Sequence, residues 1–213
     1  KAYKMLREDF ELPKMEVTLL KRIPTGSGLG GGSSNGSFML KAINELCRLG
    51  LGEDRLEEYA GRLGSDCPFF IRNIISEVEG RGDILKNPQK NLDALKEMKI
   101  IVIHPGVGVS TSDAFKILGE SRSFWQCEFD YSSFNTLTND FEEPVSEKVP
   151  EIKEVIEFLK SLNGAYTQMT GSGSAVFSLF KSKSQDSEFE AIEKKVAVKV
   201  KNKGWSFYSG NII

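Results

Sequence analysis

The chain has 213 residues, 39% of them hydrophobic and 27% charged, which is enough for one large or two small domains with buried cores. The 28 Lys and Arg residues against 30 Asp and Glu residues give a net charge of −2, so the basic surface that binds nucleic acid is not expected. No apolar run approaches the roughly 20 residues that span a bilayer, and no secretory signal is visible. These features favour a cytoplasmic protein without nucleic-acid or membrane partners, and they leave its oligomeric state open.

The cysteines and the single histidine limit the chemistry further. Cys47, Cys67 and Cys127 are scattered and odd in number, which is typical of reduced thiols rather than of a disulfide framework. His104 is the only histidine, so most histidine-based catalytic triads and histidine-rich metal sites are excluded. Because it follows an apolar strand, a structural role is favoured for it. No residue is assigned as a metal ligand.

The first elements are predicted from apolar spacing. Residues 1–10 have a helical pattern, which Pro13 ends. The alternation of apolar and polar residues in Glu16–Lys21 predicts a β-strand. A helix is expected after the glycine-rich segment that follows, and the apolar residues at helical spacing define its buried face: Phe38, Ala42, Leu46 and Leu49.

A second helix is predicted over Glu53–Leu63, because it has an acidic first turn and a glycine at its end. Gly64–Phe70 predicts a turn that leads into an apolar strand. Residues 77–85 contain a polar turn, and a domain boundary is placed near the segment 87–96. The expected domains are residues 1–95 and residues 96–213.

The second half has the element order of a split βαβ, or ferredoxin-like, unit. A buried strand is expected over Lys99–His104, and a helix over Glu151–Leu162 whose apolar residues follow i, i+3, i+4, i+7 spacing. Two strands flank the glycine turn at residues 171–173, and another helix and a final strand, Trp205–Tyr208, complete the order. The fold class predicted for the whole chain is α+β.

The glycine-rich segment Pro24–Ser34 has the composition of a phosphate-binding loop. Glycines let the backbone approach a ligand, and N–H groups at the start of the next helix attract anions. Ser33 and Ser34 are suited to cap that helix. The Walker A pattern fails, because Gly32 is followed by Ser33 rather than by Lys. A dinucleotide-binding fold and a flexible linker stay open, although a second helix stands where the dinucleotide fold requires a strand.

Asp66 is the most suggestive catalytic acid. It lies in the predicted turn between Ser65 and an apolar run that begins at Cys67, so we expect it to be partly desolvated. A carboxylate in such a place can act as a general base or orient a hydroxyl. The alternative is a turn aspartate that bonds its own backbone. The turn Thr170–Ser174 can likewise offer N–H groups to a second anion or form a tight hairpin.

Together these segments resemble the GHMP kinase superfamily, in the expected order and through nearly the whole chain. Lys21–Pro24 followed by Gly28–Asn35 resembles its nucleotide loop, and Gly64–Phe70 is similar to a Gly-Ala-Asp-Val-Pro-Phe-Phe segment. Asn139–Glu142 resembles an Asn-Asp-x-Glu helix, and Thr170–Ser174 resembles the third motif. The resemblance implies the GHMP kinase fold, a nucleotide-binding α/β half followed by a ferredoxin-like half, with the site in the cleft between them.

The resemblance also implies an ATP- and Mg²⁺-dependent kinase that acts on the 2-hydroxyl of a small molecule, a cytidine-diphosphate-linked methylerythritol. Asp66 would be the catalytic residue, as general base or orienting group. Lys21 would lie near the adenosine, and the ATP phosphates would bind Pro24, Thr25, Gly26, Ser27, Gly28, Leu29, Gly30, Gly31, Gly32, Ser33 and Ser34. Substrate contacts would come from Thr111, Gly171, Ser172 and Gly173, although helix capping explains Thr111 equally well.

Two segments of the family pattern have no counterpart in this chain. They are a lysine that pairs with the catalytic aspartate and an Asp-Gly-Tyr-His segment that grips the cytidine, and both precede Lys1 in the family. A longer natural protein is therefore expected, and without that lysine the 213 residues alone are expected to be impaired. Two alternatives stay open: another GHMP kinase, of the homoserine or mevalonate type, and a non-catalytic nucleotide-binding module.

Overall fold

The computed structural model describes residues 1–80, 82, 84–87, 95, 97–119, 137–181 and 186–212. It divides into unit 1, formed by Lys1–Arg22 and Gly30–Gln89, and unit 2, formed by Ile23–Leu29 and Lys90–Ile213. The first half of the predicted phosphate loop thus belongs to unit 2, although the segments on both sides of it belong to unit 1. The boundary between residues 95 and 96 stays a prediction. Most of the segment 87–96, like Cys127, lies outside the described residues.

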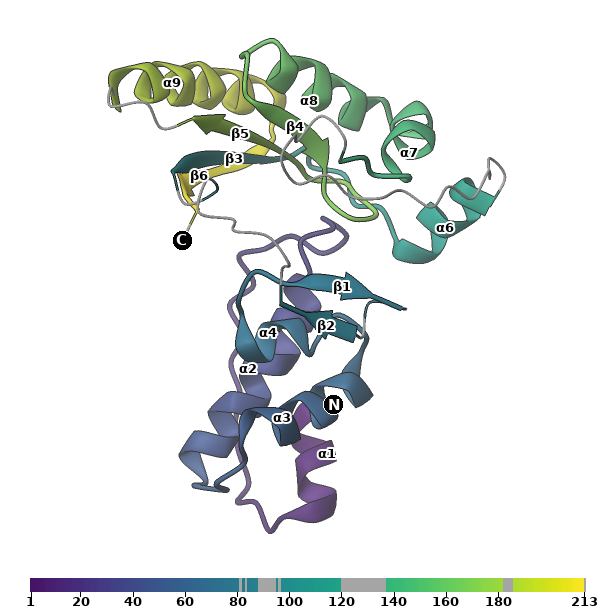
Figure 1. The fold of residues 1–213 in the computed structure, drawn as a ribbon, viewed down its shortest axis with the longest axis vertical. Coiled ribbons are helices and arrows are strands. Elements are labelled where there is room, and N and C mark those ends of the chain that lie inside the picture. Colours follow the sequence, from purple (N-terminus) through teal and green to yellow (C-terminus); the bar gives the residue numbers. More distant parts are fainter. Residues whose placement is uncertain are drawn as a thin grey trace. The chain divides into compact units, whose positions relative to one another are not determined.

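Unit 1 is mainly helical. Its helices are α1 (Ala2–Asp9), α2 (Gly31–Leu46), α3 (Glu53–Leu63) and α4 (Phe69–Arg72), and its strands β1 (Glu77–Glu79) and β2 (Ile84–Lys86) pair antiparallel (Figure 1). α2 packs against α1, α3 and α4. The core between these helices contains Leu6, Leu40, Ile43, Tyr59 and Ile71, none more than 1% exposed. α1 and α3 confirm the two helices expected over residues 1–10 and 53–63.

Glu16–Lys21 is not the expected strand. The segment has no regular secondary structure, and Val17, Leu19 and Leu20 are 59%, 56% and 76% exposed. A strand must pair its backbone N–H and C=O groups, and no strand among the described residues pairs with this segment. The alternation of apolar and polar residues predicted the strand wrongly, because this pattern does not show whether a second strand is available for pairing.

The buried face of α2 also differs from the expected one. Phe38 and Leu46 are 47% and 76% exposed, whereas Leu40 and Ile43 are fully buried. The polar Ser37 is buried on this face, since its hydroxyl donates a hydrogen bond of 2.7 Å to a carbonyl of the turn before α4. The rotation of the helix therefore follows its packing against α1, α3 and α4, and not the positions of its largest apolar residues.

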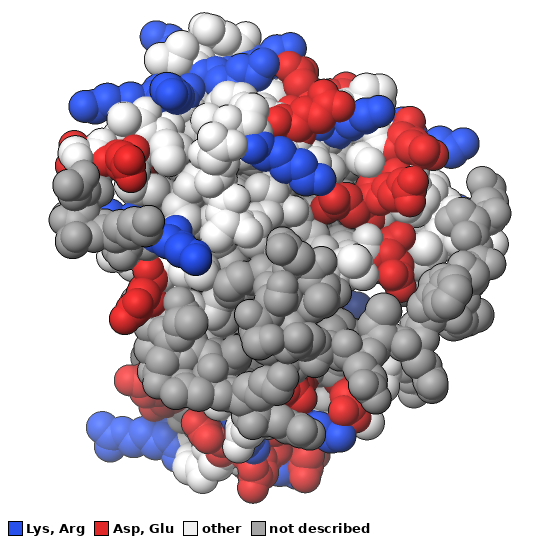
Figure 2. Space-filling model, turned by 45° about the horizontal axis from the view of Figure 1, so that its top comes forward, with Lys and Arg blue, Asp and Glu red and all other residues white. Residues whose placement is uncertain are grey.

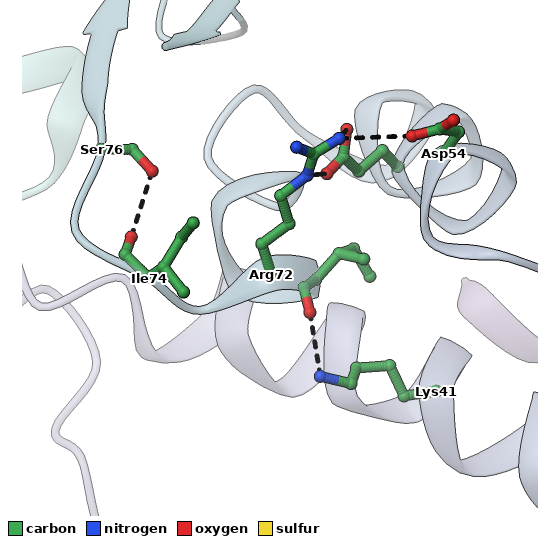
Figure 3. A network of polar contacts seen from close by, with 7 residues as sticks. Lys41, Asp54, Arg72, Ile74 and Ser76 are labelled. Carbon is green, nitrogen blue, oxygen red and sulfur yellow. Dashed lines mark hydrogen bonds and ion pairs between the residues drawn. The ribbon is translucent and has the colours of Figure 1, made fainter. Parts of the chain in front are cut away.

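The apolar run after Pro68 forms the short helix α4 instead of the expected strand. The N–H groups of Phe70 and Ile71 donate to carbonyls three residues earlier, both at 3.0 Å, so the turn winds directly into a helix. At its C-terminal end, Lys41 of α2 donates to the carbonyl of Ile71 at 2.9 Å, and Arg72 pairs with two carboxylates of α3 (Figure 3). These contacts with two neighbouring helices outweigh the strand propensity of the aromatic residues.

Unit 2 is built on a four-stranded antiparallel sheet. Its strands are β3 (Met98–His104), β4 (Tyr166–Met169), β5 (Val176–Lys181) and β6 (Ser206–Asn211), in the spatial order β4-β5-β3-β6. Helices α8 (Pro150–Lys160) and α9 (Asp186–Lys203) cover one face of the sheet, and α6 (Thr111–Gly119) and α7 (Glu142–Lys148) come before α8 in the chain (Figure 1). The order β3-α8-β4-β5-α9-β6 confirms the ferredoxin-like unit.

The apolar face of α8 forms the centre of the core of unit 2. Ile101 and Ile103 of β3 are fully buried in one cluster with Ile152, Val155 and Leu159 of α8. Alternate residues of a strand point to the same face of a sheet, and residues three and seven positions apart share a face of a helix. The predicted strand, the predicted helix and its apolar stripe are therefore confirmed.

Charges of both signs are interspersed on the face shown in Figure 2. On α9, Lys199 and Lys203 donate hydrogen bonds to the carboxylate of Glu154 on α8, at 3.0 and 2.9 Å. This mixture is typical of an ordinary solvated surface. Among the described helices, none combines the length and the apolar character that crossing a membrane requires.

Two leucines of α2 test which face of the helix is buried. Leu40→Ala removes a fully buried side chain and should lower the free energy of unfolding by about 2–5 kcal/mol. Leu46→Ala, the matched change at a site that is 76% exposed, should alter it by less than about 0.5 kcal/mol. Urea denaturation followed by circular dichroism measures both. Similar losses in the two variants would contradict the packing described for α2.

His104 is 9% exposed at the end of β3. Its Nδ1 accepts a hydrogen bond from the N–H of Gly106 at 3.2 Å, while its Nε2 is buried and bonds to none of the described residues. Burial lowers the pKa of His104, because the imidazolium would lose its hydration. The neutral, buried imidazole supports the structural role expected for this residue.

This neutral histidine should make the fold less stable in mild acid. The unfolded chain takes up a proton near pH 6.5, whereas folded His104 takes it up only at a lower pH. Its stabilisation is therefore complete above the unfolded pKa and is lost as the pH falls through the lowered pKa of the folded state. Between about pH 7.5 and 5.5, His104→Gln should lose less free energy of unfolding than the wild type. If the variant and the wild type lose the same free energy of unfolding over this pH range, groups other than His104 cause the acid sensitivity.

Candidate functional site

The first half of the phosphate loop, Ile23–Leu29, is hydrogen-bonded to the turn between β4 and β5. The carbonyls of Gly26 and Ser27 accept hydrogen bonds from the N–H groups of Ser174 and Ala175, at 3.2 and 2.9 Å. Both glycine-rich segments of unit 2 are therefore parts of one structure, although they lie far apart in the sequence.

Two further bonds and a close approach hold this arrangement. The N–H of Val109 donates to the Gly26 carbonyl at 3.0 Å, and the hydroxyl of Thr170 donates to the Ser27 carbonyl at 3.1 Å. Gly28 has a φ of +73°, and a Cβ there would lie 2.8 Å from the Thr170 hydroxyl and closer still to its carbonyl oxygen. Only glycine fits at this position.

The second half of the loop forms the start of α2 in unit 1. Gly30 is the N-cap with a φ of +63°, and the first helical hydrogen bond runs from the N–H of Ser34 to its carbonyl at 2.8 Å. The N–H groups of Gly31, Gly32 and Ser33 have no acceptor within the helix. No side chain caps this end and no acidic residue lies in its first turn, so it can receive an anion. The two serines lie inside the first turn, and their expected capping role is wrong, since the left-handed glycine takes the cap position.

Asp66 lies in the turn between α3 and α4, and its side chain is exposed. The expected partial desolvation is therefore wrong: the neighbouring Cys67 and Pro68 are buried, and the carboxylate is not. The N–H of Cys67 donates to the Gly64 carbonyl at 3.1 Å, and the hydroxyl of Ser37 donates to the Cys67 carbonyl at 2.7 Å. The second bond connects the Asp66 turn to α2.

A cavity of about 510 Å³ in unit 1 is lined both by α2 and by the Asp66 turn. Gly32 and Ser33 come from the first turn of α2, and Gly64 and Cys67 lie on either side of Asp66 in the turn. Burial raises the pKa of the Cys67 thiol, and hydrogen bonds with two serine hydroxyls of α2 partly oppose that rise. Unit 1 thus brings an open helix N-terminus and the candidate catalytic turn to one cavity.

The predicted substrate-binding residues meet within unit 2. Thr111 is the first residue of α6, and its hydroxyl oxygen lies 3.5 Å from that of Ser172. Gly171 and Gly173, with φ of +47° and +84°, shape the turn around Ser172. Helix α6 is capped by Ser110, whose hydroxyl accepts the N–H of the third helical residue at 3.1 Å. Capping therefore does not account for Thr111, and its role in binding stays a prediction.

The remaining predicted residues are divided between the units. Lys21 is exposed in unit 1, whereas Pro24 and Thr25 belong with the loop segment of unit 2. Within the described ranges, no three His, Cys, Asp or Glu side chains gather closely enough to hold a metal ion.

Asn139 and Glu142 had no role in the sequence analysis beyond their likeness to an Asn-Asp-x-Glu helix. Both bond through their side chains to the backbone at or beside the β4–β5 turn. Local sequence carries no signal for such contacts, because they join positions about 30 residues apart.

Two family models match the chain. The model of the GHMP kinases N terminal domain matches residues 1–73, and that of the GHMP kinases C terminal matches residues 127–197. The two matches fall on opposite sides of the segment where the sequence placed a domain boundary.

Three curated relatives of similar sequence have the same name. A 4-diphosphocytidyl-2-C-methyl-D-erythritol kinase of Bacteroides fragilis is 40% identical over 193 residues, which cover 84% of this chain and 66% of that protein. Its namesake from Azobacteroides pseudotrichonymphae is 39% identical over 187 residues, covering 85% and 69%. The one from Bacteroides thetaiotaomicron is 41% identical over 185 residues, covering 84% and 66%. This chain spans about two thirds of the length of these curated relatives.

Solved structures show the same likeness. A crystal structure of 4-(cytidine 5'-diphospho)-2C-methyl-D-erythritol kinase superposes with a TM-score of 0.62 at 31% identity, covering 75% of this chain and 59% of that one. A homoserine kinase from Cytophaga hutchinsonii superposes with a TM-score of 0.61 at 19% identity, covering 90% and 68%. At that identity the second match shows the fold alone.

Substitution by alanine should affect the stability of the protein differently at two glycines of the loop. Gly28→Ala forces a Cβ against Thr170 at a positive φ, and should lower the free energy of unfolding by about 1–3 kcal/mol. Gly32→Ala places its Cβ where no atom lies within 4 Å, inside a helix that alanine favours, and should cause no loss. Chemical denaturation measures both. A Gly28→Ala variant as stable as the wild type would contradict the docking of the loop.

Proposed function

The chain belongs to the GHMP kinases, and from this membership we propose that it catalyses the ATP-dependent phosphorylation of 4-diphosphocytidyl-2-C-methyl-D-erythritol at its 2-hydroxyl, a step in isoprenoid precursor biosynthesis. The relatives named for that reaction, at 39–41% identity, support the choice of substrate. The structural observation that carries the proposal is the cavity of unit 1, which is lined by both the start of α2 and the Asp66 turn.

The start of α2 fits a nucleotide triphosphate. Three N–H groups without helical acceptors and the positive end of the helix dipole attract phosphate oxygens. The absence of a side-chain cap and of an acidic residue in the first turn leaves them open to an anion, and the space beside Gly32 admits one. We assign ATP binding to Lys21 and to Pro24–Ser34. ATP supplies the phosphoryl group, and Mg²⁺ neutralises part of its charge.

Asp66 is assigned as the general base or orienting group. Its carboxylate accepts the proton of the substrate hydroxyl while the hydroxyl oxygen bonds to the transferred phosphorus, and ADP leaves. An exposed carboxylate is accessible to an incoming hydroxyl, and the Ser37 bond to the neighbouring carbonyl keeps the turn next to α2. Phosphoryl transfer depends mostly on such positioning and on charge neutralisation.

Substrate binding is assigned to Thr111 and to Gly171, Ser172 and Gly173. The 3.5 Å separation of the Thr111 and Ser172 hydroxyl oxygens supports treating them as one polar group. We place the reaction in the cytoplasm, and the free thiols of Cys47 and Cys67 support that location.

A panel of alcohols tests the proposal. ADP release by the longer, full-length protein that the sequence predicts should be seen with 4-diphosphocytidyl-2-C-methyl-D-erythritol and not with homoserine or mevalonate. ADP release with homoserine or mevalonate would show that the proposed substrate is wrong. If the protein binds ATP but releases ADP with none of the three alcohols, it is a nucleotide-binding module rather than a kinase.

In the active protein, Asp66→Asn should lower kcat by at least about 100-fold with little change in the Kd of ATP. Asp54→Asn, which removes another exposed carboxylate of unit 1, is the matched control and should keep its kcat.

A further inference from the structure

The segment that precedes α7 holds the β4–β5 turn through one amide side chain. The Nδ2 of Asn139 donates to the carbonyls of Met169 and Gly171, both at 2.8 Å. Its Oδ1 accepts the N–H of Phe141 at 3.0 Å, which fixes the amide in this orientation. Every polar atom of the side chain is thus bonded to backbone, and the two bonds to the turn lie on either side of Thr170.

A carboxylate of α7 holds the same segment from the end of β4. The Oε2 of Glu142 accepts the N–H of Met169 at 2.7 Å. The other oxygen lies 3.9 Å from the Nζ of Lys160.

Tyr166 of β4 lies near the same carboxylate. Burial, with the nearby charge of Glu142, raises the pKa of Tyr166 to about 12. This tyrosine therefore stays neutral and donates to the carbonyl of Leu137 at 2.9 Å.

On the side of Asn139, the turn borders open space rather than a packed core. A cavity of about 510 Å³ borders it, and its lining includes Asn139, Gln168, Thr170 and Gly171. Two backbone hydrogen bonds close the turn, from the N–H of Thr170 to the Ala175 carbonyl and from the N–H of Gly173 to the Thr170 carbonyl, both at 2.8 Å. Its two glycines with positive φ still have alternative conformations available, so further bonds restrict it. The side chains of Asn139 and Glu142 supply an additional restraint from outside the turn.

The other side of the turn holds the loop. The N–H groups of Ser174 and Ala175 and the hydroxyl of Thr170 donate to the carbonyls of Gly26 and Ser27. The turn therefore lies between the segment Asn139–Glu142 and the loop, and a change in its conformation moves the donors on which the loop depends.

We propose that Asn139 and Glu142 are positioning residues that fix the β4–β5 turn and, through it, the phosphate loop at Gly26–Gly28. The link to catalysis rests on the proposed function, in which this loop binds ATP. A loop held in its binding conformation before the nucleotide arrives saves the ordering cost of binding. Neither residue needs to touch the nucleotide to affect its affinity.

Amide hydrogen exchange on the chain without nucleotide tests the proposal directly. Asn139→Asp keeps the shape of the side chain and the acceptor for Phe141, but removes both donors to the turn. The N–H groups of Ser174 and Ala175 should then exchange about tenfold faster, while Ile101 in the centre of the sheet keeps its rate. Unchanged exchange at the turn would overturn the proposal, as would equal acceleration at Ile101, which indicates general destabilisation.

Glu142 offers a conservative series with a matched control. Glu142→Ala loses the acceptor for the Met169 N–H and should accelerate exchange at this amide and in the turn. Glu142→Gln retains an acceptor oxygen and should restore wild-type rates within about threefold. Glu143→Ala removes the adjacent, exposed carboxylate and should have no effect. If the glutamine variant behaves like the alanine variant, the hydrogen bond is not what holds the turn.

Calorimetry with ATP tests the second step. Asn139→Asp should raise the Kd of ATP about tenfold, in line with the exchange rates. Faster exchange with an unchanged Kd would overturn the connection to the nucleotide. If the wild-type chain itself fails to bind ATP, the proposed function is refuted, and the exchange rates alone decide whether Asn139 and Glu142 position the turn.

Discussion

The hydrogen bonds that the β4–β5 turn donates to the carbonyls of Gly26 and Ser27 are the constraint on which the rest of the site depends. They hold in unit 2 a segment whose neighbours on both sides belong to unit 1. The approach is close enough that Gly28 has no room for a side chain. Gly28 is therefore needed for close contact between two segments of the chain, and the loop has two tasks. Its first half is bound to the β4–β5 turn, and its second half forms the start of α2.

A similar bond organises unit 1. The hydroxyl of Ser37 donates to the Cys67 carbonyl and so connects the turn that carries Asp66 to the early turns of α2. In both units, hydrogen bonds with a turn bring together segments that lie far apart in the sequence. Such bonds are buried or partly buried, where an unpaired carbonyl would be costly, so each of them stabilises the fold and also determines which groups meet at the candidate site.

The elements that were predicted well are those whose signals are local. Helix α3 begins and ends where its acidic first turn and Gly64 indicated, and the stripe of Ile152, Val155 and Leu159 on α8 faces the core as its spacing required. The elements predicted wrongly depended on neighbours. Glu16–Lys21 has the alternation of a strand but pairs with no strand among the described residues, and the run after Pro68 follows its contacts with α2 and α3 into a helix.

By itself, the sequence determined the α+β class, the ferredoxin-like order of the second half, the glycine-rich loop and the likeness to the GHMP kinases, because spacing, glycine content and motif order are properties of short segments. Only the tertiary structure decided that Asp66 is exposed, that Gly30 and not a serine is the N-cap of α2, and that Asn139 and Glu142 bond to the β4–β5 turn. The physical reason is that burial and side-chain hydrogen bonds are set by residues distant in the chain, whose approach no local pattern records.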